Sequence, residues 1–316
     1  MIRPNPRVEP SEIAWRAART KILAIDIDGT LVDGEGELSP RVESAIERAR
    51  DAGIAIVLCT GRRYRRTLPL AERLGLIEPI VCNSGALVKQ PGAHRTILRS
   101  EIDRALFDQI VRLFCEHHYR MVYFLDRGLD SFDFSIDRYP SGSAWFDDYV
   151  AKNLDRVEVA GSGLIDRPNT DPPFHVFAIG ELDEMLAFER EVHQAIDGRV
   201  RTFVQKSRQY DGTMCEILRG DANKWSALAY LAEKWGISTE DICAVGDDQN
   251  DVPMIEGAGI GVAMGNAPAH VRDAADLVVP ANHADGLAVL IDYLLAKRSS
   301  DPIDRSMILR DRDDRE

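Results

Sequence analysis

Two carboxylates, Asp26 and Asp28, stand two residues apart where an apolar run meets a glycine. The run Ile22-Leu-Ala-Ile25 consists of β-forming or small apolar residues, and Gly29 ends it. Side chains two residues apart project to the same side of a strand end, so the two carboxylates repel each other unless a cation joins them. A hard divalent ion such as Mg²⁺ binds a few protein oxygens and keeps water and phosphate oxygens as its other ligands. The pattern predicts a phosphate-handling site, and the alternative is a strand that runs into an acidic turn.

A second acidic cluster follows another apolar run, Ile242-Cys-Ala-Val245. The next residues read Gly246-Asp-Asp-Gln-Asn-Asp251, so three carboxylates and two amides fall within five positions. Carboxylates this close are costly unless a cation or a lysine balances them. The alternative is an acidic turn in which Asp251 caps the next helix.

Groups that could bind phosphate occur at two further strand or helix ends. Thr60-Gly61-Arg62 directly follows the apolar run 54–59, which places a hydroxyl and loop N–H groups at the same sheet edge as Asp26. Thr60 could also cap a helix, and the two roles are compatible. Lys224 opens a predicted helix, where a cation is slightly unfavourable against the helix dipole. A lysine there is usually a solvated charge, but its unfavourable placement indicates another task.

Length, composition and charge narrow the class of protein. The chain has 316 residues with 45% hydrophobic content, enough for a sizeable core and longer than one usual compact domain. Its formal charge of −13 argues against wrapping a nucleic-acid backbone or docking on an anionic membrane, because both need clustered cations. No apolar run approaches the roughly 20 residues that span a bilayer, and the N-terminus lacks the apolar core of a signal peptide.

The five cysteines are widely scattered, and no pair has the close spacing of a zinc site or a redox motif. Cys59, Cys82 and Cys243 lie inside apolar, strand-like runs, which favours buried free thiols. We therefore expect a reducing, cytoplasmic compartment.

Strand and helix alternate from Lys21 to about Lys89. Ser39-Pro40 supplies an N-cap and a first-turn proline, apolar residues follow at helical spacing, and Gly53 stands where a C-terminal glycine belongs. Strands are predicted over 54–59 and 79–82, with a helix through 68–74 between them. This order predicts a right-handed, parallel βαβ sheet.

The pattern changes between about Lys89 and Arg208. Alternating or aromatic strand-like runs occur there with helical stretches at 103–118 and 182–197, which predicts a separate α+β domain. These runs are Arg95–Arg99, Arg120–Leu125, Phe132–Ile136, Val157–Val159 and Phe174–Ile179. From about Cys215 the first pattern returns, with a helix over 224–235 and strands at 242–245, 259–263 and 277–279. The predicted organisation is an N-terminal arm over 1–20, a first core part over 21–89, an inserted domain over 90–208, a second core part over 209–296 and a charged tail over 297–316.

Taken together, four motifs resemble those of the haloacid dehalogenase superfamily. They are Asp26-Ile-Asp28-Gly-Thr, Thr60-Gly61-Arg62, Lys224 and Gly246-Asp-Asp-Gln-Asn-Asp251, in the family's order. An α+β insertion after Asn83-Ser-Gly-Ala is similar to the Cof-like phosphatases with a type IIB cap. Many relatives read Asn-Gly-Ala there, and residues 219–224 are a longer lead-in to the lysine than is usual. The resemblance covers about residues 21–296 and implies an α/β fold, a Rossmann-like parallel-sheet core with an inserted α+β cap domain.

The resemblance also implies a mechanism. Asp26 would be the nucleophile that becomes an aspartyl-phosphate, and Asp28 the general acid and then the general base. The implied Mg²⁺ ligands are Asp26, the backbone carbonyl of Asp28, and Asp247. The implied phosphate contacts are the amide of Ile27, Thr60, Gly61, Lys224 and Asn250. The residues expected to support these groups without contacting phosphate are Asp251, Arg62 and Asn83.

Three functions compete at this point. A phosphatase for small phosphomonoesters, with sugar phosphates or similar metabolites as substrates, is the first. A phosphomutase of the phosphomannomutase type needs the same aspartyl-phosphate but also cap cations to hold a bisphosphate, and the cations of residues 90–208 are scattered among acids. A non-catalytic phosphate-binding regulatory module is disfavoured because every chemical residue is present. We expect a small phosphorylated metabolite as the partner, no nucleic acid or membrane, and a monomer or homodimer.

Overall fold

The computed structural model describes residues 2–5, 9–129, 131–161, 172–206 and 210–298. The chain divides into two compact units. The core unit consists of Met1–Ile97 and Lys224–Glu316, and the inserted unit consists of Leu98–Asn223. The predicted charged tail over 297–316 lies outside the described residues except for Lys297 and Arg298.

A six-stranded sheet forms the centre of the core unit, in the order β1-β15-β14-β13-β2-β3. Its strands are Arg3–Pro4 (β1), Leu277–Val278 (β15), Ile260–Ala263 (β14), Ile242–Gly246 (β13), Ile22–Ile25 (β2) and Ala55–Leu58 (β3). All neighbours pair in parallel except β1, which runs antiparallel to β15 at the edge. The inner strands are apolar on both faces because helices cover both, as in other parallel sheets. The predicted parallel sheet is confirmed.

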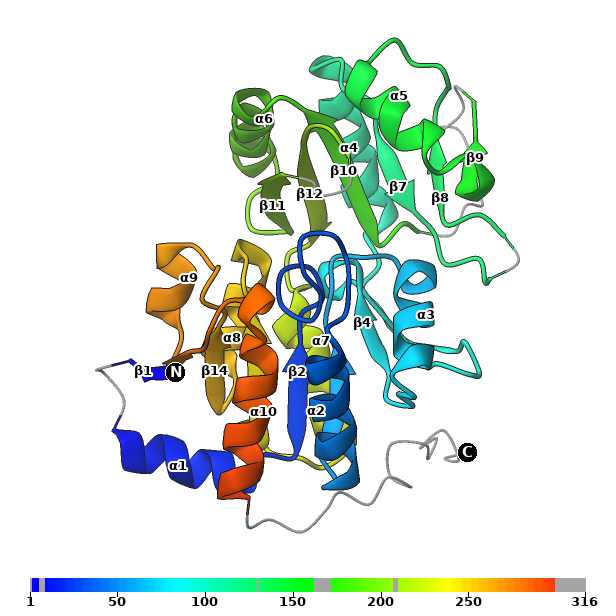
Figure 1. Cartoon of the computed structure of the whole chain (residues 1–316). Helices are drawn as coiled ribbons and strands as arrows, with labels where there is room; N and C mark the ends of the chain where they lie inside the picture. The colour runs from blue at the N-terminus through cyan, green and yellow to red at the C-terminus, as the bar shows by residue number, and fades with distance from the viewer. Residues whose placement is uncertain (1, 6–8, 130, 162–171, 207–209, 299–316) are drawn as a thin grey trace. The chain divides into compact units, whose positions relative to one another are not determined.

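Helices cover both faces of this sheet. Figure 1 shows α2 and α10 in front of β2 and α7 behind it. The helices of the core unit are Pro10–Arg19 (α1), Pro40–Asp51 (α2), Tyr64–Arg73 (α3), Lys224–Lys234 (α7), Val252–Gly257 (α8), Ala269–Ala274 (α9) and Gly286–Lys297 (α10). The predicted start of α2 is confirmed, because the Ser39 hydroxyl accepts a hydrogen bond from the N–H of Arg41 and Pro40 is the first helical residue.

Residues 10–19 of the predicted N-terminal arm form the helix α1, which the sequence did not predict. Ile13 and Ala17, on one face of α1, are buried, and the helix contacts α10. Arg19 and Lys21 bind the buried Asp241 carboxylate at 3.1 and 3.0 Å. Ile13 and Ala17 lie one helical turn apart, and their burial packs α1 onto the core unit.

A short three-stranded sheet adjoins the edge of the main sheet. Its strands are Ile80–Cys82 (β4), Leu87–Lys89 (β5) and Thr96–Arg99 (β6), in the order β4-β5-β6, and β4 and β5 pair antiparallel. A parallel bridge between Cys59 and Val81 joins β4 to the residue after β3. The third predicted strand thus lies beside the second, as expected for successive βαβ units.

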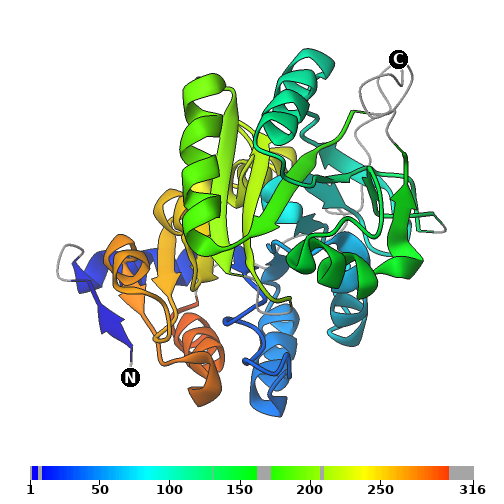
Figure 2. The same ribbon diagram turned by 90° about the horizontal axis from the view of Figure 1, so that it is seen from above.

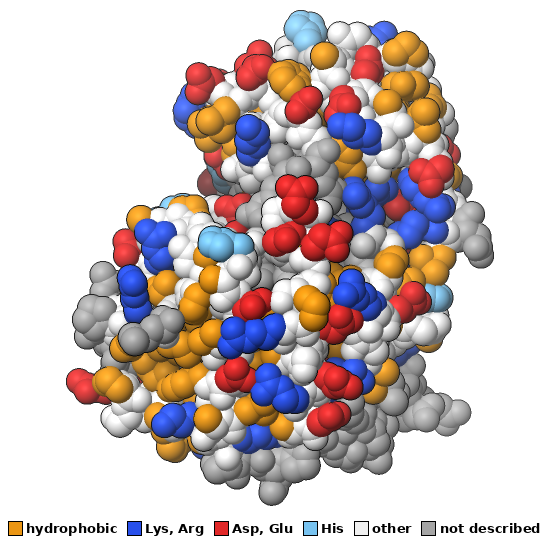
Figure 3. All heavy atoms as spheres, viewed as in Figure 1, with side chains coloured by type: hydrophobic (Ala, Val, Ile, Leu, Met, Phe, Trp, Pro, Cys, Tyr) orange, Lys and Arg blue, Asp and Glu red, His pale blue; other side chains and the backbone are white. Residues whose placement is uncertain are grey.

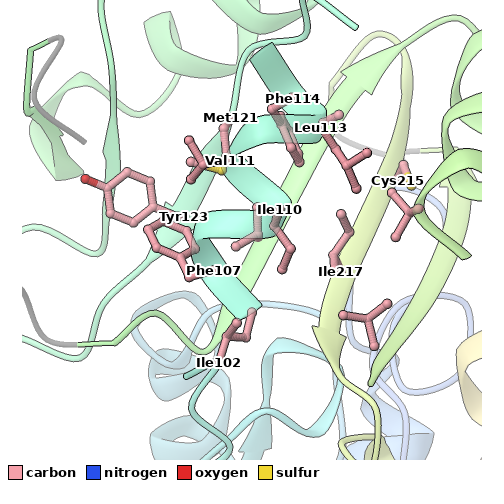
Figure 4. Packing of buried hydrophobic residues seen from close by; sticks show 14 of the residues in the cluster. Ile102, Phe107, Ile110, Val111, Leu113, Phe114, Met121, Tyr123, Cys215 and Ile217 are labelled. Carbon is pink, nitrogen blue, oxygen red and sulfur yellow. The ribbon is translucent and has the colours of Figure 1, made fainter. Parts of the chain in front are cut away.

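The inserted unit is a six-stranded sheet in the order β11-β12-β10-β7-β8-β9, antiparallel except for the pair β8–β9. Its elements are Arg104–Glu116 (α4), Val122–Phe124 (β7), Phe134–Ile136 (β8), Ala144–Ala151 (α5), Val157–Val159 (β9), His175–Gly180 (β10), Leu182–Ala195 (α6), Val200–Lys206 (β11) and Thr213–Arg219 (β12). Figure 2 shows α4 and α6 on the same side of the strands. Their apolar faces enclose one hydrophobic cluster with the facing strand residues (Figure 4). The predicted α+β character of this region is confirmed.

The return from the inserted unit differs from the expected boundary. We expected the second core part to begin near residue 209, but β12 pairs with β10 on one side and β11 on the other. The inserted unit therefore extends to Asn223, and it begins at Leu98 rather than near residue 90. The apolar run over 213–218 suits a buried strand of either sheet, and only its pairing assigns it.

All five cysteines are free, and Cys59, Cys82 and Cys243 are buried as predicted, whereas Cys115 is exposed. Among the described residues, no helix has the length and apolarity that crossing a membrane requires. Figure 3 shows one face of the molecule, on which Lys and Arg side chains are interspersed with Asp and Glu side chains.

Candidate active site

Asp26 is the first residue after β2, at the carboxyl edge of the main sheet. Its N–H donates to the carbonyl of Val245 in β13 at 3.0 Å, which holds it level with the end of the neighbouring strand. Asp247 follows the end of β13, and Thr60 follows β3 on the other side. Parallel strands end at one edge, so three polar segments far apart in the sequence meet there. The structure thus brings the predicted residues together.

Lys224 joins two of the predicted carboxylates. It is fully buried as the first residue of α7, and its Nζ lies 2.6 Å from Asp26 Oδ1 and 2.6 Å from Asp251 Oδ1. A buried ammonium needs such partners because desolvation is costly. The unfavourable placement of this lysine at a helix N-terminus is therefore compensated by two anions.

Three carboxylates form a compact group around this lysine. One oxygen from each of Asp26, Asp247 and Asp251 lies within 4.8 Å of the others, and all three residues are buried. Three carboxylates and one ammonium leave a formal charge of −2 in this group. Burial raises the pKa of Asp26 well above its ordinary value, and Asp251 and Asp247 raise it further against the opposing effect of Lys224. Hard oxygen donors with surplus negative charge fit a divalent cation such as Mg²⁺.

Asp251 supports the end of β13 from behind. Its Oδ2 accepts hydrogen bonds from the N–H groups of Asp247 at 2.9 Å and Asp248 at 3.0 Å. A Cβ at Gly246 would lie 2.4 Å from the Cβ and Cγ of Asp251, so only glycine fits there. Asp251 also stands at the N-cap position of α8, but its side chain makes no capping bond to that helix. The alternative role of this carboxylate, as a cap for α8, is therefore wrong.

The Asp28 carboxylate forms a bidentate ion pair with Arg62. The Arg62 Nε donates to Asp28 Oδ2 at 2.7 Å and its Nη2 donates to Oδ1 at 2.6 Å. The Asp28 side chain is 32% exposed and the Arg62 side chain is 17% exposed, so this bidentate pair is partly open to solvent. Each of the two carboxylates has its own basic side chain, Lys224 for Asp26 and Arg62 for Asp28.

The loop Thr60-Gly61-Arg62 turns on itself before α3 begins. Thr60 is fully buried, and its hydroxyl accepts a hydrogen bond from the N–H of Arg62 at 3.0 Å. The N-cap position of α3 is Arg63, so Thr60 is not the helix cap considered as its alternative role. The turn Asn83–Gly85 is hydrogen-bonded to the same loop. The N–H of Asn83 donates to Arg62 O and the N–H of Ser84 donates to Thr60 O, each at 3.0 Å.

Asn83 and Ser84 both adopt left-handed backbone conformations, with φ of 49° and 54°. Such conformations cost about 1–3 kcal/mol in non-glycine residues and persist where the surroundings impose them. Here two backbone hydrogen bonds to the Thr60 loop impose them. Asn83 thus acts on this loop through its backbone.

Ile27 and Asn250 complete the predicted set. The Ile27 side chain is fully buried and its carbonyl accepts from the N–H groups of Leu31 and Val32, each at 3.0 Å, so the residue tightens the turn after Asp26. Asn250 is 6% exposed in the 3₁₀ turn Gln249–Asp251 beside Asp247.

Two residues at this edge were missed by the sequence interpretation. Asn266 Nδ2 donates to Asp247 Oδ2 at 3.1 Å, and Thr30 Oγ1 donates to Asp247 Oδ1 at 3.3 Å. A signal for Asn266 exists, because Gly265-Asn266 follows the apolar run that ends β14, as the other motifs follow their strands.

Comparison with known proteins identifies the family. Residues 23–291 match the model of the haloacid dehalogenase-like hydrolases. The 5-amino-6-(5-phospho-D-ribitylamino)uracil phosphatase YwtE of Bacillus subtilis is 30% identical over 87% of this chain and 98% of its own length. The pyridoxal phosphate phosphatase YbhA of Escherichia coli is 28% identical over 86% of this chain and 97% of its own length. A solved haloacid dehalogenase subclass IIB sugar phosphatase shares the fold, with a TM-score of 0.70 and 21% identity over 87% of this chain and 98% of that one.

The chain belongs to the haloacid dehalogenase-like hydrolase family. It is accordingly an enzyme, a hydrolase of the phosphatase kind. The predicted resemblance and the predicted α/β fold are confirmed.

Proposed function

We propose that this enzyme is a Mg²⁺-dependent phosphatase that hydrolyses small phosphomonoesters through an aspartyl-phosphate on Asp26. The observation that carries the proposal is the contact of the buried Asp26 with Lys224 inside a group of three carboxylates at the strand ends. A carboxylate in such a group is fixed in position and needs a cation before it can accept an anionic substrate. Both conditions suit a nucleophile that attacks a phosphate ester.

The first half of the reaction transfers the phosphoryl group. The Asp26 carboxylate attacks phosphorus in line, a bond forms between its oxygen and phosphorus, and the bond from phosphorus to the ester oxygen breaks. Asp28 gives its proton to that departing oxygen, which leaves as an alcohol. Arg62 donates to both oxygens of Asp28 in this structure, so one of these hydrogen bonds has to break when Asp28 carries the proton that it transfers.

The second half releases phosphate. Asp28, now a carboxylate, takes a proton from water while the water oxygen attacks phosphorus. The bond between Asp26 and phosphorus breaks, and inorganic phosphate and the free Asp26 carboxylate are formed. One residue thereby serves as acid and then as base.

Charge on the transferring group is met by donors at the strand ends. Asp26, Asp247 and the backbone carbonyl of Asp28 would hold Mg²⁺, which when bound offsets the repulsion between the carboxylate and the phosphate. Asp251 would act indirectly, because its oxygens already bind Lys224 and two backbone N–H groups. The proposed phosphate contacts are the amide of Ile27, Thr60, Gly61, Lys224 and Asn250. One such donor is typically worth ~10²–10³ in rate.

The substrate proposed is a small phosphorylated metabolite, with sugar phosphates as the broad class. The residues above address only the phosphoryl group, so we assign discrimination among leaving groups to the inserted unit. The two curated relatives carry names with different substrates, a ribitylaminouracil phosphate and pyridoxal phosphate. We further propose a cytoplasmic monomer or homodimer without nucleic-acid or membrane partners.

Steady-state assays test the proposal. The purified chain should hydrolyse p-nitrophenyl phosphate with Mg²⁺ and lose this activity when EDTA removes the metal. Glucose-1-phosphate with catalytic amounts of the bisphosphate should not be isomerised, and isomerisation faster than hydrolysis would make the enzyme a mutase. Absence of turnover across a panel of phosphorylated metabolites would favour a regulatory module instead.

A further inference from the structure

The side chain of Asn266 joins three segments of the core unit. Its Nδ2 donates to Asp247 Oδ2 at 3.1 Å and to the carbonyl of Gly29 at 2.9 Å. Its Oδ1 accepts from the N–H of Asn282 at 3.0 Å. One amide therefore links the end of β13, the loop after Asp28 and the 3₁₀ turn Asn282–Ala284 that precedes α10.

These bonds orient the Asp247 carboxylate from one side. Asn266 binds Oδ2, and the hydroxyl of Thr30 binds Oδ1 at 3.3 Å. A carboxylate with a donor on each oxygen cannot rotate freely about its own axis. The direction in which Asp247 offers its remaining lone pairs is thus set by two neighbours.

The close approach of Gly265 to residues 279–281 fixes the position of Asn266. A Cβ at Gly265 would lie 2.7 Å from Ala281 N and 2.9 Å from Val279 O, so the loop passes too close to this segment for any other residue. Asn266 itself is exposed. Hydrogen bonds of an exposed amide contribute little to folding, because water can take their place. Stability alone therefore gives a weak reason for this arrangement.

The amide type also matters. Both partners of Nδ2 are acceptors, a carboxylate oxygen and a carbonyl oxygen, so the group between them must donate twice. An amide nitrogen offers two donors. An aspartate of the same shape would present oxygens to Asp247 and Gly29 instead.

We propose that Asn266 is a positioning residue that orients Asp247 and thereby sets the affinity of the site for a divalent cation. The inference rests on the proposed function, in which Asp247 is a metal ligand. Groups that hydrogen-bond to a metal-binding side chain typically contribute 10–100-fold to metal affinity or activity. Asn266 meets that description through a direct hydrogen bond to the ligand oxygen.

Titration calorimetry with Mg²⁺ tests the inference directly. We expect Asn266→Ala to weaken Mg²⁺ binding at least about tenfold. The Mg²⁺ concentration for half-maximal hydrolysis of p-nitrophenyl phosphate should rise by a similar factor, while KM for the ester at saturating Mg²⁺ stays within about twofold. Asn266→Gln keeps an amide on a longer stem and should lie between the wild type and Asn266→Ala.

Asn282→Ala is the matched control. It removes the hydrogen bonds from Asn282 Nδ2 to the carbonyl of Val32, of 3.1 Å, and from the N–H of His283 to Asn282 Oδ1, of 2.9 Å. It keeps the backbone N–H of Asn282, which donates to Asn266 Oδ1. Its Mg²⁺ affinity should stay within about twofold of the wild type. Unchanged affinity in a folded Asn266→Ala variant, or an equal loss in both variants, would overturn the inference and leave the proposed function standing. Failure of the wild type to bind Mg²⁺ would instead overturn the metal role of Asp247 and this inference with it.

Discussion

The core unit and the inserted unit bury ionisable groups in different ways. In the core unit, Asp26, Asp247, Asp251 and Lys224 are all buried at the sheet edge, where they contact one another. Among the described residues of the inserted unit, His175 on β10 and Glu216 on β12 form a buried ionisable pair, with 3.6 Å between His175 Nε2 and Glu216 Oε2. This pair lies within the sheet, among aromatic rings.

Burial disfavours the charged form of both His175 and Lys224, but the neighbours of these two residues differ. Burial lowers the pKa of His175, and Glu216 only partly opposes it. The ring of Phe124 stacks on His175 with 4.9 Å between centroids, so an apolar neighbour favours the neutral imidazole. In the core unit the ammonium of Lys224 stays charged because two carboxylates hold it. The comparison teaches that the core unit retains buried charge, whereas the inserted unit favours the neutral form of its buried histidine.

Removing the central carboxylate of the core unit should give the largest effect. Asp26→Asn is nearly isosteric and keeps an oxygen that Lys224 can bind, so the fold should persist. Because the amide is a poor nucleophile, kcat for p-nitrophenyl phosphate should fall at least about a thousandfold. Circular dichroism and steady-state kinetics check both expectations. Residual activity within tenfold of the wild type would show that Asp26 is not the nucleophile.

Glycine replacements compare the tightness of the two units. A Cβ at Gly246 would meet the Asp251 side chain at 2.4 Å, so Gly246→Ala should destabilise the core unit by about 1–3 kcal/mol and slow turnover by displacing Asp251. Gly180→Ala in the inserted unit meets only the flexible ends of Glu184 and Met185, at 3.0 and 3.1 Å, and should cost less. Urea unfolding measures both. Equal costs would contradict the rigid contact assigned to Gly246.

Weakening the two hydrogen bonds from Arg62 to Asp28 should have an intermediate effect on kcat. Arg62→Lys keeps the charge but loses the two parallel hydrogen bonds, so Asp28 is less well placed for proton transfer. We expect kcat to fall about tenfold, since small misplacements of catalytic groups are costly. Stability should change by less than about 1 kcal/mol, because the pair is partly exposed. A kcat equal to that of the wild type would remove the positioning role from Arg62.

The His175 pair should give the smallest effect, seen in stability rather than turnover. Because the folded-state pKa of His175 lies below its ordinary value of 6.5, the unfolded chain gains a proton there first as the pH falls. The free energy of unfolding therefore decreases below about pH 6.5, by at most about 1.4 kcal/mol per pH unit from this group. His175→Gln should flatten that dependence in urea unfolding between pH 5 and 7. An unchanged slope would mean that folding does not shift the pKa of His175.

The strands and the acidic motifs of the core unit could be predicted because their signals are local. An apolar run followed by polar residues marks both a buried strand and its functional end, as at Asp26 and Asp247. Parallel pairing then brings these ends together without any knowledge of distant contacts. The burial of Lys224 could be suspected from its unfavourable position at a helix start.

Other features depend on contacts between distant segments. The pairing of Asp28 with Arg62 requires the loop after β3 to approach the loop after β2. Asn266 is one amide in a loop, and only the close passage of Gly265 along 279–281 gives it its partners. The strand β12 fits either sheet by its sequence, and the arm helix α1 depends on two buried side chains, so pairing and packing decide both.

The central claim, covalent catalysis by Asp26, has one direct test. Sodium borohydride reduces an acyl phosphate to an alcohol but leaves a free carboxylate unchanged. The wild-type enzyme is quenched with borohydride during turnover of p-nitrophenyl phosphate, and the peptide that contains residue 26 is analysed by mass spectrometry. We predict reduction at residue 26, only with substrate and Mg²⁺ present. Reduction at a different carboxylate, or an intact Asp26 at full turnover, would contradict the account.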